Sequence, residues 1–169
     1  NGLSAKHECT IFSYSVKYPE RFGVVQRNLS GDVIRFLEKP AEFISNEVVT
    51  GLYYFNVNSL ARKLKKNTRS ERGELETPSI LNSYVNENSA NVSNLSRGNF
   101  WIDAGTIEDL MVASEFVKSY ESRAGRLIAC NEEIAFNNGW IGAEKLKHLA
   151  SKYPDGSYRD YILTLLYMK

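Results

Sequence analysis

A nearly continuous run of apolar and aromatic residues, Val48 to Val57, constrains the fold of this 169-residue chain most strongly. A short run of this kind is typical of a strand that is buried on both faces of a sheet. The residues before it also favour strands, because Phe12, Tyr14 and Val16 alternate with polar residues at a period of two. The first part of the chain is therefore predicted to form a sheet.

Two apolar segments, 23–26 and 33–37, flank a Leu-Ser-Gly-Asp sequence at 29–32. Strand-like segments separated by such turn residues predict a β-hairpin. A short basic helix is predicted over 59–66. Thr77 is predicted to cap the next helix, with Pro78 as its first helical residue and an end near residue 87.

The rest of the chain returns briefly to strands and then becomes helical. Segments 90–95 and 100–103 are predicted strands, and a capping-box pattern at 106–109 begins another helix. Residues 130–169 predict three short helices, broken by Asn-Gly and Pro-Asp-Gly sequences. Strands followed by helices indicate the α/β class, with a mixed sheet and a helical C-terminal tail.

Charge and cysteine content narrow the function classes. With 21 basic and 20 acidic residues the net charge is +1, which gives no bulk attraction for nucleic acid. No apolar run approaches the roughly 20 residues of a membrane span. The two cysteines, Cys9 and Cys130, are predicted to be reduced and buried, as in a cytosolic protein. We therefore expect a cytoplasmic protein that binds neither a nucleic acid polymer nor a membrane.

Two candidate ligand contacts lie in the predicted sheet. Gly23 begins a strand, where the missing side chain lets a ligand approach the backbone; the alternative is a plain turn over 19–23. Glu38 and Lys39 end a strand, where the carboxylate can accept hydrogen bonds from hydroxyls and the ammonium can meet a phosphate. The alternative for this second pair is a solvated surface ion pair.

Two more candidates follow in the chain. The planar guanidinium of Arg72 can bind a phosphate, with Glu74 and Glu76 to position it. The alternative is that this acidic segment precedes the helix at Thr77 and interacts favourably with the helix dipole. Asp103 precedes a glycine and a capped helix, which suits a ligand of a divalent metal. The alternative is that Asp103 accepts hydrogen bonds from backbone amides in the turn.

Together these clusters resemble one family, the glucose-1-phosphate thymidylyltransferases among the sugar nucleotidyltransferases. The resemblance covers the chain from Thr10 onward and rests on segments 19–25, 38–40, 49–53, 72–76, 101–106 and 128–140. It implies a Rossmann-like nucleotide-diphospho-sugar transferase fold, of which this chain resembles the C-terminal part. The helical segment 128–140 is characteristic of the thymidylyltransferases within the wider family.

The resemblance also implies a reaction, in which glucose 1-phosphate attacks the α-phosphate of dTTP, with Mg²⁺ bound, to form dTDP-glucose and pyrophosphate. This reaction opens the dTDP-rhamnose pathway of polysaccharide precursor synthesis. Phosphoryl transfers of this kind depend mainly on positioning and charge neutralisation. The resemblance implies that Asp103 is a metal ligand and that Lys39 and Arg72 are cations on the phosphates. It also implies that the Glu38 carboxylate binds the glucose hydroxyls. The remaining contacts to the sugar are implied for Gly23, Val49 and Tyr53.

The resemblance divides the chain into a sugar-phosphate-binding part, 1–127, and a C-terminal helical segment, 128–169. For the second segment, the resemblance implies contacts between subunits of a homotetramer and an effector site that includes Glu133 and Ile134. Phe136 and Asn137 stand where the family commonly has Trp and Arg.

The Gly-Gly-x-Gly-Thr-Arg-Leu loop and the second metal aspartate of the family do not occur in these 169 residues. We therefore expect a truncated enzyme that does not turn over alone. Two alternatives stay open: a non-catalytic sugar-phosphate-binding or oligomerisation module, and a sister enzyme with another sugar or base. The joint presence of Glu38, Lys39, Arg72 and Asp103 argues against the module, and segment 128–140 argues against the sister enzyme.

Overall fold

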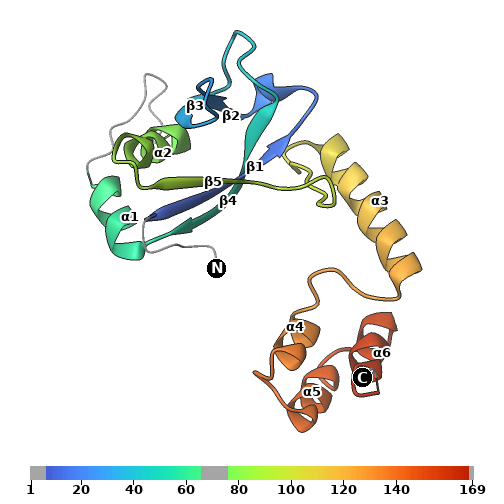
Figure 1. Cartoon of the computed structure of the whole chain (residues 1–169). Coiled ribbons are helices and arrows are strands. Elements are labelled where there is room, and N and C mark those ends of the chain that lie inside the picture. The colour runs from blue at the N-terminus through green and yellow to red at the C-terminus, as the bar shows by residue number, and fades with distance from the viewer. Residues whose placement is uncertain (1–6, 66–75, 168–169) are drawn as a thin grey trace. The chain divides into compact units, whose positions relative to one another are not determined.

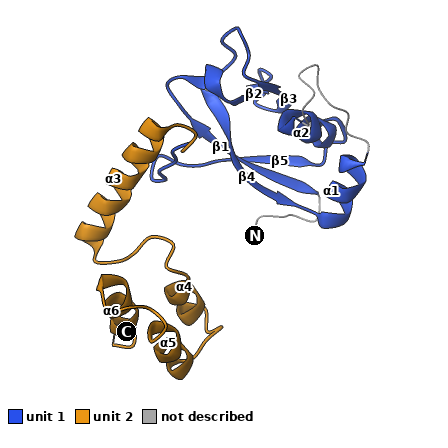
Figure 2. Cartoon of the chain, turned by 180° about the vertical axis from the view of Figure 1, so that it is seen from behind, with its two compact units in different colours: residues 1–103 blue, residues 104–169 orange. Residues whose placement is uncertain are grey.

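The computed structural model describes residues 7–65 and 76–167 (Figure 1). The chain folds into two compact units, residues 1–103 and 104–169, which Figure 2 shows in blue and orange. The functional division predicted between residues 127 and 128 stays a prediction. None of the helices in the described residues combines the length and the apolar character that crossing a membrane requires.

Unit 1 is built on a five-stranded sheet with the order β3-β2-β4-β1-β5. Strands β1 and β5 pair in parallel, and the other neighbours pair antiparallel. The sheet is therefore mixed, and the predicted α/β class is confirmed. The strands are β1 (Cys9–Ser15), β2 (Gly23–Arg27), β3 (Val33–Glu38), β4 (Glu47–Phe55) and β5 (Ala90–Asn94).

The predicted hairpin is formed by β2 and β3, which pair from Gly23↔Glu38 to Arg27↔Val33. Its loop is stabilised by the Asn28 side chain, which accepts hydrogen bonds from the amides of residues 30 and 32 at 3.0 and 2.9 Å. This side-chain turn is a common role of asparagine in tight loops. The hairpin brings the first residue of β2 and the last residue of β3 to the same end of the sheet.

The apolar run that predicted a buried strand forms β4, which lies at the centre of the sheet. The prediction that both faces are buried is wrong. Helix α2 (Thr77–Asn86) packs against the face that carries Phe55, through Tyr84. Leu52 and Tyr54 lie on the opposite face and are 52% and 50% exposed. The alternation of side chains along a strand therefore separates two environments that the uniform apolar run does not distinguish.

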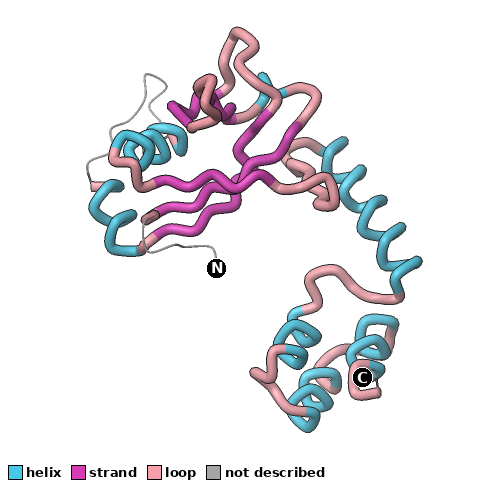
Figure 3. The backbone as a smooth tube through the Cα atoms, in the orientation of Figure 1, coloured by secondary structure: helices cyan, strands magenta, loops and turns pink. Residues whose placement is uncertain are grey.

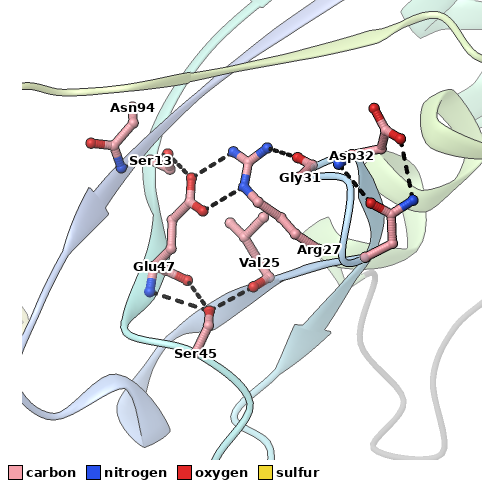
Figure 4. Close-up of polar contacts among 9 residues, drawn as sticks. Ser13, Val25, Arg27, Gly31, Asp32, Ser45, Glu47 and Asn94 are labelled. Carbon is pink, nitrogen blue, oxygen red and sulfur yellow. Dashed lines mark hydrogen bonds and ion pairs between the residues drawn. The ribbon is translucent and has the colours of Figure 1, made fainter.

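A polar cluster explains why a buried serine lies within the sheet. Ser13 is fully buried and donates a hydrogen bond to the Glu47 carboxylate at 2.5 Å. Arg27 binds both oxygens of the same carboxylate at 2.8 Å and also donates to the Gly31 carbonyl, as Figure 4 shows. Asn94 donates to the Ser13 hydroxyl at 3.2 Å. Buried polar groups are tolerated when they are paired in this way, and this cluster ties four strands together.

Helices α1 (Val57–Leu64) and α2 pack beside each other on the sheet (Figure 1). The predicted cap of α2 is wrong by one residue: the helix begins at Thr77, its N-cap residue is Glu76, and Pro78 is its second residue. The amide of Asn82 bonds both backbone groups of Phe36 in the edge strand β3, at 2.7 and 2.9 Å. These bonds fix α2 on the sheet and pair a part of an edge that would otherwise be open.

The predicted strand at 100–103 is wrong. Figure 3 shows the segment between β5 and α3 as loop, and residues 100–105 have no regular secondary structure. Leu95 still donates a backbone hydrogen bond to Ser13, at 2.8 Å, but the chain then turns at residues 96–99. Trp101 in this segment packs against Phe22 and Tyr14, and a periodicity argument cannot separate such tertiary packing from strand pairing.

The described residues of unit 2 form helices α3 (Ile107–Ala124), α4 (Asn131–Asn137), α5 (Ala143–Ala150) and α6 (Ser157–Thr164). The predicted helix start is confirmed, because the Thr106 hydroxyl accepts a hydrogen bond from the Asp109 amide at 3.1 Å. The three short helices predicted for the C-terminal part are also confirmed. They enclose a small core of Cys130, Leu146, Ala150, Ile162 and Leu165.

Both cysteines are free and buried, as predicted. Burial raises the pKa of the Cys9 thiol to about 12, although the positive charge of Lys63 acts in the opposite direction. Buried neutral thiols behave as small apolar side chains. Cys9 is therefore part of the core of unit 1.

Candidate functional site

A cavity of about 290 Å³ lies in unit 1, between the β2–β3 end of the sheet, the middle of β4, the first turn of α2 and the coil that follows β5. This is close to the lower limit of about 300 Å³ for small-molecule sites. The cavity brings together residues from five segments of the sequence. All the predicted sugar, phosphate and metal contacts among the described residues line it: Gly23, Glu38, Lys39, Val49, Tyr53 and Asp103.

Gly23 and Glu38 form one corner of this cavity. They are paired across β2 and β3, so that the glutamate side chain lies over the glycine. A Cβ atom on Gly23 would lie 3.4 Å from Oε2 of Glu38 and 3.7 Å from Pro78 of α2. The glycine therefore keeps open the space beside the carboxylate, where a ligand can reach the backbone.

Lys39 follows Glu38 in a left-handed backbone conformation, with φ at 40°. Its amide donates a hydrogen bond to the Phe22 carbonyl at 3.0 Å, which closes the end of the hairpin. Its ammonium lies 4.0 Å from the Glu38 carboxylate and is half exposed at the cavity. Non-glycine residues with positive φ are uncommon and gather at ligand sites. The corner thus presents a hydrogen-bond acceptor next to a cation.

Tyr53 and Val49 supply the wall that β4 contributes. Burial, together with the neighbouring Cys9 and Glu38, raises the pKa of the Tyr53 phenol to about 12. The phenol therefore stays protonated at neutral pH and can donate a hydrogen bond. Together with Leu81 of α2, these side chains make the cavity partly apolar, as is usual for sites that bind small organic molecules.

Asp103 is the acidic group that the coil after β5 contributes to the cavity, and it is exposed. Within residues 7–65 and 76–167, no group of three or more His, Cys, Asp or Glu side chains could hold a metal ion. Mg²⁺, however, is usually bound by one or two carboxylates together with waters and substrate phosphates. The donor set therefore fits Mg²⁺ only in this manner, with Asp103 as one protein ligand.

Sequence reasoning gave no ligand role to several residues that line this cavity, among them Thr50, Gly51 and Trp101. Gly51 has φ at 82° and lies in an irregular section of the β1–β4 pairing. An isolated glycine inside a strand pattern is a signal of a bulge, and it would have indicated this feature. No comparable signal exists for the Trp101 side chain, because its contacts are with residues distant in sequence.

Two predicted groups cannot be assigned to the cavity. Arg72 and Glu74 lie outside the described residues, whereas Glu76 is described and is the N-cap residue of α2. The predicted effector residues lie in unit 2, on α4. There the Glu133 carboxylate accepts a hydrogen bond from Tyr161 at 2.6 Å, and Ile134 is 44% exposed.

The geometry can be compared with known proteins. The nucleotidyl transferase family profile matches residues 2–120. The chain is 41% identical over 162 residues to a glucose-1-phosphate thymidylyltransferase of Neisseria meningitidis serogroup A, which covers 95% of this chain and 55% of that protein. It is 38% identical over 158 residues to the enzyme of that name from Mycobacterium tuberculosis, with 92% and 54% covered. The chain thus spans about half the length of these curated relatives.

A solved structure leads to the same group. A Bacillus anthracis protein described as a candidate glucose-1-phosphate thymidylyltransferase, in complex with sucrose, is 33% identical and superposes with a TM-score of 0.58. The match covers 66% of this chain and 44% of that chain. The fold, the profile match over most of the sequence and these relatives agree, and the chain belongs to the nucleotidyl transferase family.

Proposed function

We propose that the unit 1 cavity binds glucose 1-phosphate as the acceptor in thymidylyl transfer from dTTP, which yields dTDP-glucose and pyrophosphate for dTDP-rhamnose synthesis in the cytoplasm. The observation that carries this proposal is the convergence of Gly23, Glu38, Lys39 and Asp103 on one cavity. The curated relatives that bear the thymidylyltransferase name support the choice of base and sugar.

Each proposed contact follows from the chemistry of its side chain. The Glu38 carboxylate accepts hydrogen bonds from glucose hydroxyls, and Gly23 leaves room for the sugar ring against the backbone. The Lys39 ammonium, which lies 4.0 Å from the Glu38 carboxylate, binds the phosphate. Val49 and Tyr53 form the wall against which the sugar packs. Arg72 is proposed as a second phosphate cation on the family resemblance alone.

In the reaction, a glucose 1-phosphate oxygen forms a bond to the α-phosphorus of dTTP, while the bond to pyrophosphate breaks. Lys39 and Arg72 hold the attacking phosphate in place and offset its negative charge, which otherwise opposes the approach of two anions. Asp103 would hold Mg²⁺, which supplies further charge neutralisation when bound. The remaining contacts orient the sugar, so that one oxygen faces the donor.

Two further assignments belong to the same proposal. We infer a nucleotide effector site that includes Glu133 and Ile134, and a homo-oligomer in which the helical segment 128–169 makes contacts between subunits. Ile134 is exposed on α4 and is available for such a contact. Sedimentation of the purified chain, with and without dTDP-glucose, tests the oligomer, and a monomer under both conditions would contradict it.

Isothermal titration of the chain with glucose 1-phosphate tests the acceptor site. Glu38→Gln keeps the shape of the side chain but weakens its hydrogen bonds to hydroxyls, and we expect affinity to fall by about tenfold, the effect of losing one charged hydrogen bond. Glu42→Gln is the matched control, because this exposed glutamate lines a different depression of the surface. Equal affinities of Glu38→Gln and Glu42→Gln would contradict the proposed sugar contact.

A further inference from the structure

The coil between β5 and α3 brings Asp103 to the cavity without the support of a strand or helix. A carboxylate in a coil is held only by the contacts of its neighbours, and ligand binding requires that it be held in place. Trp101 lies two residues before Asp103 and makes several such contacts. Both residues line the same cavity.

The contacts of Trp101 reach three separate parts of unit 1. Its indole N–H donates a hydrogen bond to the Thr50 carbonyl of β4 at 3.1 Å. Its ring meets Phe22 edge-on, with centroids 5.5 Å apart and planes at 69°, and it lies 6.0 Å from the ring of Tyr14 in β1. The edge-to-face pair with Phe22 is favourable at this distance, and half-buried tryptophans usually pair their N–H group.

A bulge explains why the Thr50 carbonyl is available. Ile11 pairs with Tyr53 and Ser13 pairs with Val49, so that residues 50–52 of β4 lie opposite Phe12 alone. Extra residues in a strand interrupt its hydrogen bonding to the neighbouring strand and change the direction of its backbone groups. The Thr50 hydroxyl donates to the Phe12 carbonyl at 2.9 Å, which ties the bulge to β1. The Thr50 carbonyl then accepts from the indole.

We propose that Trp101 is a positioning residue for Asp103: its indole clamps the coil onto the β4 bulge, so that the carboxylate stays at the cavity of Glu38 and Lys39. The inference rests on the proposed function, in which Asp103 binds the metal. The same clamp also shapes the cavity wall, because Thr50 and Trp101 both line it.

The geometry is tested on the full 169-residue chain by NMR. Trp101→Phe keeps an aromatic ring and removes the N–H group, and Trp140→Phe is the control, since Trp140 is 73% exposed and is the only other tryptophan. Each variant deletes one indole signal and thereby assigns it. We expect the Trp101 N–H to exchange about tenfold more slowly than that of Trp140, and Trp101→Phe to mobilise residues 100–103 while β1 and β4 stay protected.

The second readout is one that a merely structural role would not produce. Glucose 1-phosphate is titrated with and without Mg²⁺, and Asp103→Asn is expected to abolish the gain in affinity that Mg²⁺ gives. Trp101→Phe should reduce this gain by about fivefold, which corresponds to one hydrogen bond, so that its loss of affinity is larger with Mg²⁺ than without it. The double variant should match Asp103→Asn alone, because the two residues act through one site.

The outcomes separate the two proposals. Equal exchange of the two indole protons, an unchanged mobility of residues 100–103 in Trp101→Phe, or an equal loss of affinity with and without Mg²⁺ would overturn the role of Trp101. If the indole is protected and Trp101→Phe mobilises residues 100–103, but the wild-type chain binds no glucose 1-phosphate, the positioning role stands and the proposed substrate is wrong.

Discussion

Gly23 and Glu38 face each other across the β2–β3 pairing, and the carboxylate of one lies over the bare Cα of the other. A Cβ atom on Gly23 would make contacts of 3.4 to 3.9 Å with its neighbours, which are ordinary van der Waals distances. The fold therefore tolerates a methyl group at this position. The space that it would fill is the space that the proposed ligand needs.

The first prediction follows from this pair. Gly23→Ala should leave the thermal unfolding midpoint nearly unchanged and weaken glucose 1-phosphate binding by at least about tenfold, because the methyl group displaces the sugar from the backbone. Calorimetric titration and thermal melting measure the two effects. Gly98→Ala, in a loop where the added Cβ would lie 3.9 Å from Ser96, is the control and should change neither. Undiminished binding by Gly23→Ala would be incompatible with the proposed sugar position.

The second prediction concerns the left-handed backbone of Lys39. Asparagine adopts this conformation more readily than lysine, so Lys39→Asn should preserve stability or raise it by up to about 1 kcal/mol. It removes the cation, so affinity for glucose 1-phosphate should fall while affinity for glucose itself is unchanged. Lys65→Asn, on the exposed end of α1, is the matched control. A loss of affinity for both ligands would mean that Lys39 does not act on the phosphate.

The third prediction concerns Asn82, whose amide pairs both backbone groups of Phe36. Asn82→Ala should lower the free energy of unfolding by about 2 kcal/mol, since two partly buried hydrogen bonds are lost. Asn86→Ala, at the exposed end of the same helix, controls for helix propensity. Denaturant unfolding measures both, and equal losses in the two variants would show that the Phe36 bonds contribute nothing.

The fourth prediction is a pH dependence of stability. Burial raises the pKa of Glu47, but hydrogen bonds from Arg27, Ser13 and Asn94 and the charge of Arg27 lower it by more, so the net pKa lies below the ordinary value of 4.5. A carboxyl group with a lowered pKa stabilises the fold above its unfolded pKa, and this contribution is lost as the pH falls through the folded pKa.

Glu47→Gln should therefore be less stable than the wild type by about 1 kcal/mol at neutral pH. The difference should shrink progressively below about pH 4.5, where the wild-type carboxyl group becomes protonated. Urea unfolding at several pH values measures the difference, with Glu42→Gln as the control. A gap that is constant down to pH 3 or so would contradict the ionic role of Glu47.

A fifth prediction concerns turnover. With dTTP, glucose 1-phosphate and Mg²⁺, these 169 residues should release no pyrophosphate, because they contain no glycine-rich loop for the triphosphate. A coupled pyrophosphate assay measures this. Release at a rate that Glu38→Gln lowers would contradict the expectation and would mean that another segment binds dTTP.

Much of the fold could be predicted because local patterns agree with it. The β2–β3 hairpin, the three C-terminal helices and the Thr106 cap follow from turn and capping residues. The prediction of a strand at 100–103 was wrong because the apolar Trp101 packs against Phe22 and Tyr14 from a coil and does not belong to a strand. The burial of Ser13 could not be predicted either, since it depends on Glu47 and Arg27 from other strands.

The cavity residues were named from motifs, and the structure brings the described ones together. Their convergence could not be calculated from spacing, because it depends on the register of β2 with β3 and on the bulge at Thr50. Arg72 remains a prediction from the resemblance.

The acceptor role of the cavity is tested most directly by recording ¹⁵N–¹H spectra of the chain during titration with glucose 1-phosphate. We predict saturable shifts of the amides of Gly23, Glu38, Lys39 and Thr50, with little change in unit 2. Glucose should shift the first two and affect Lys39 least. An absence of shifts at these residues, or shifts confined to residues 104–167, would contradict the proposal that this cavity holds the sugar phosphate.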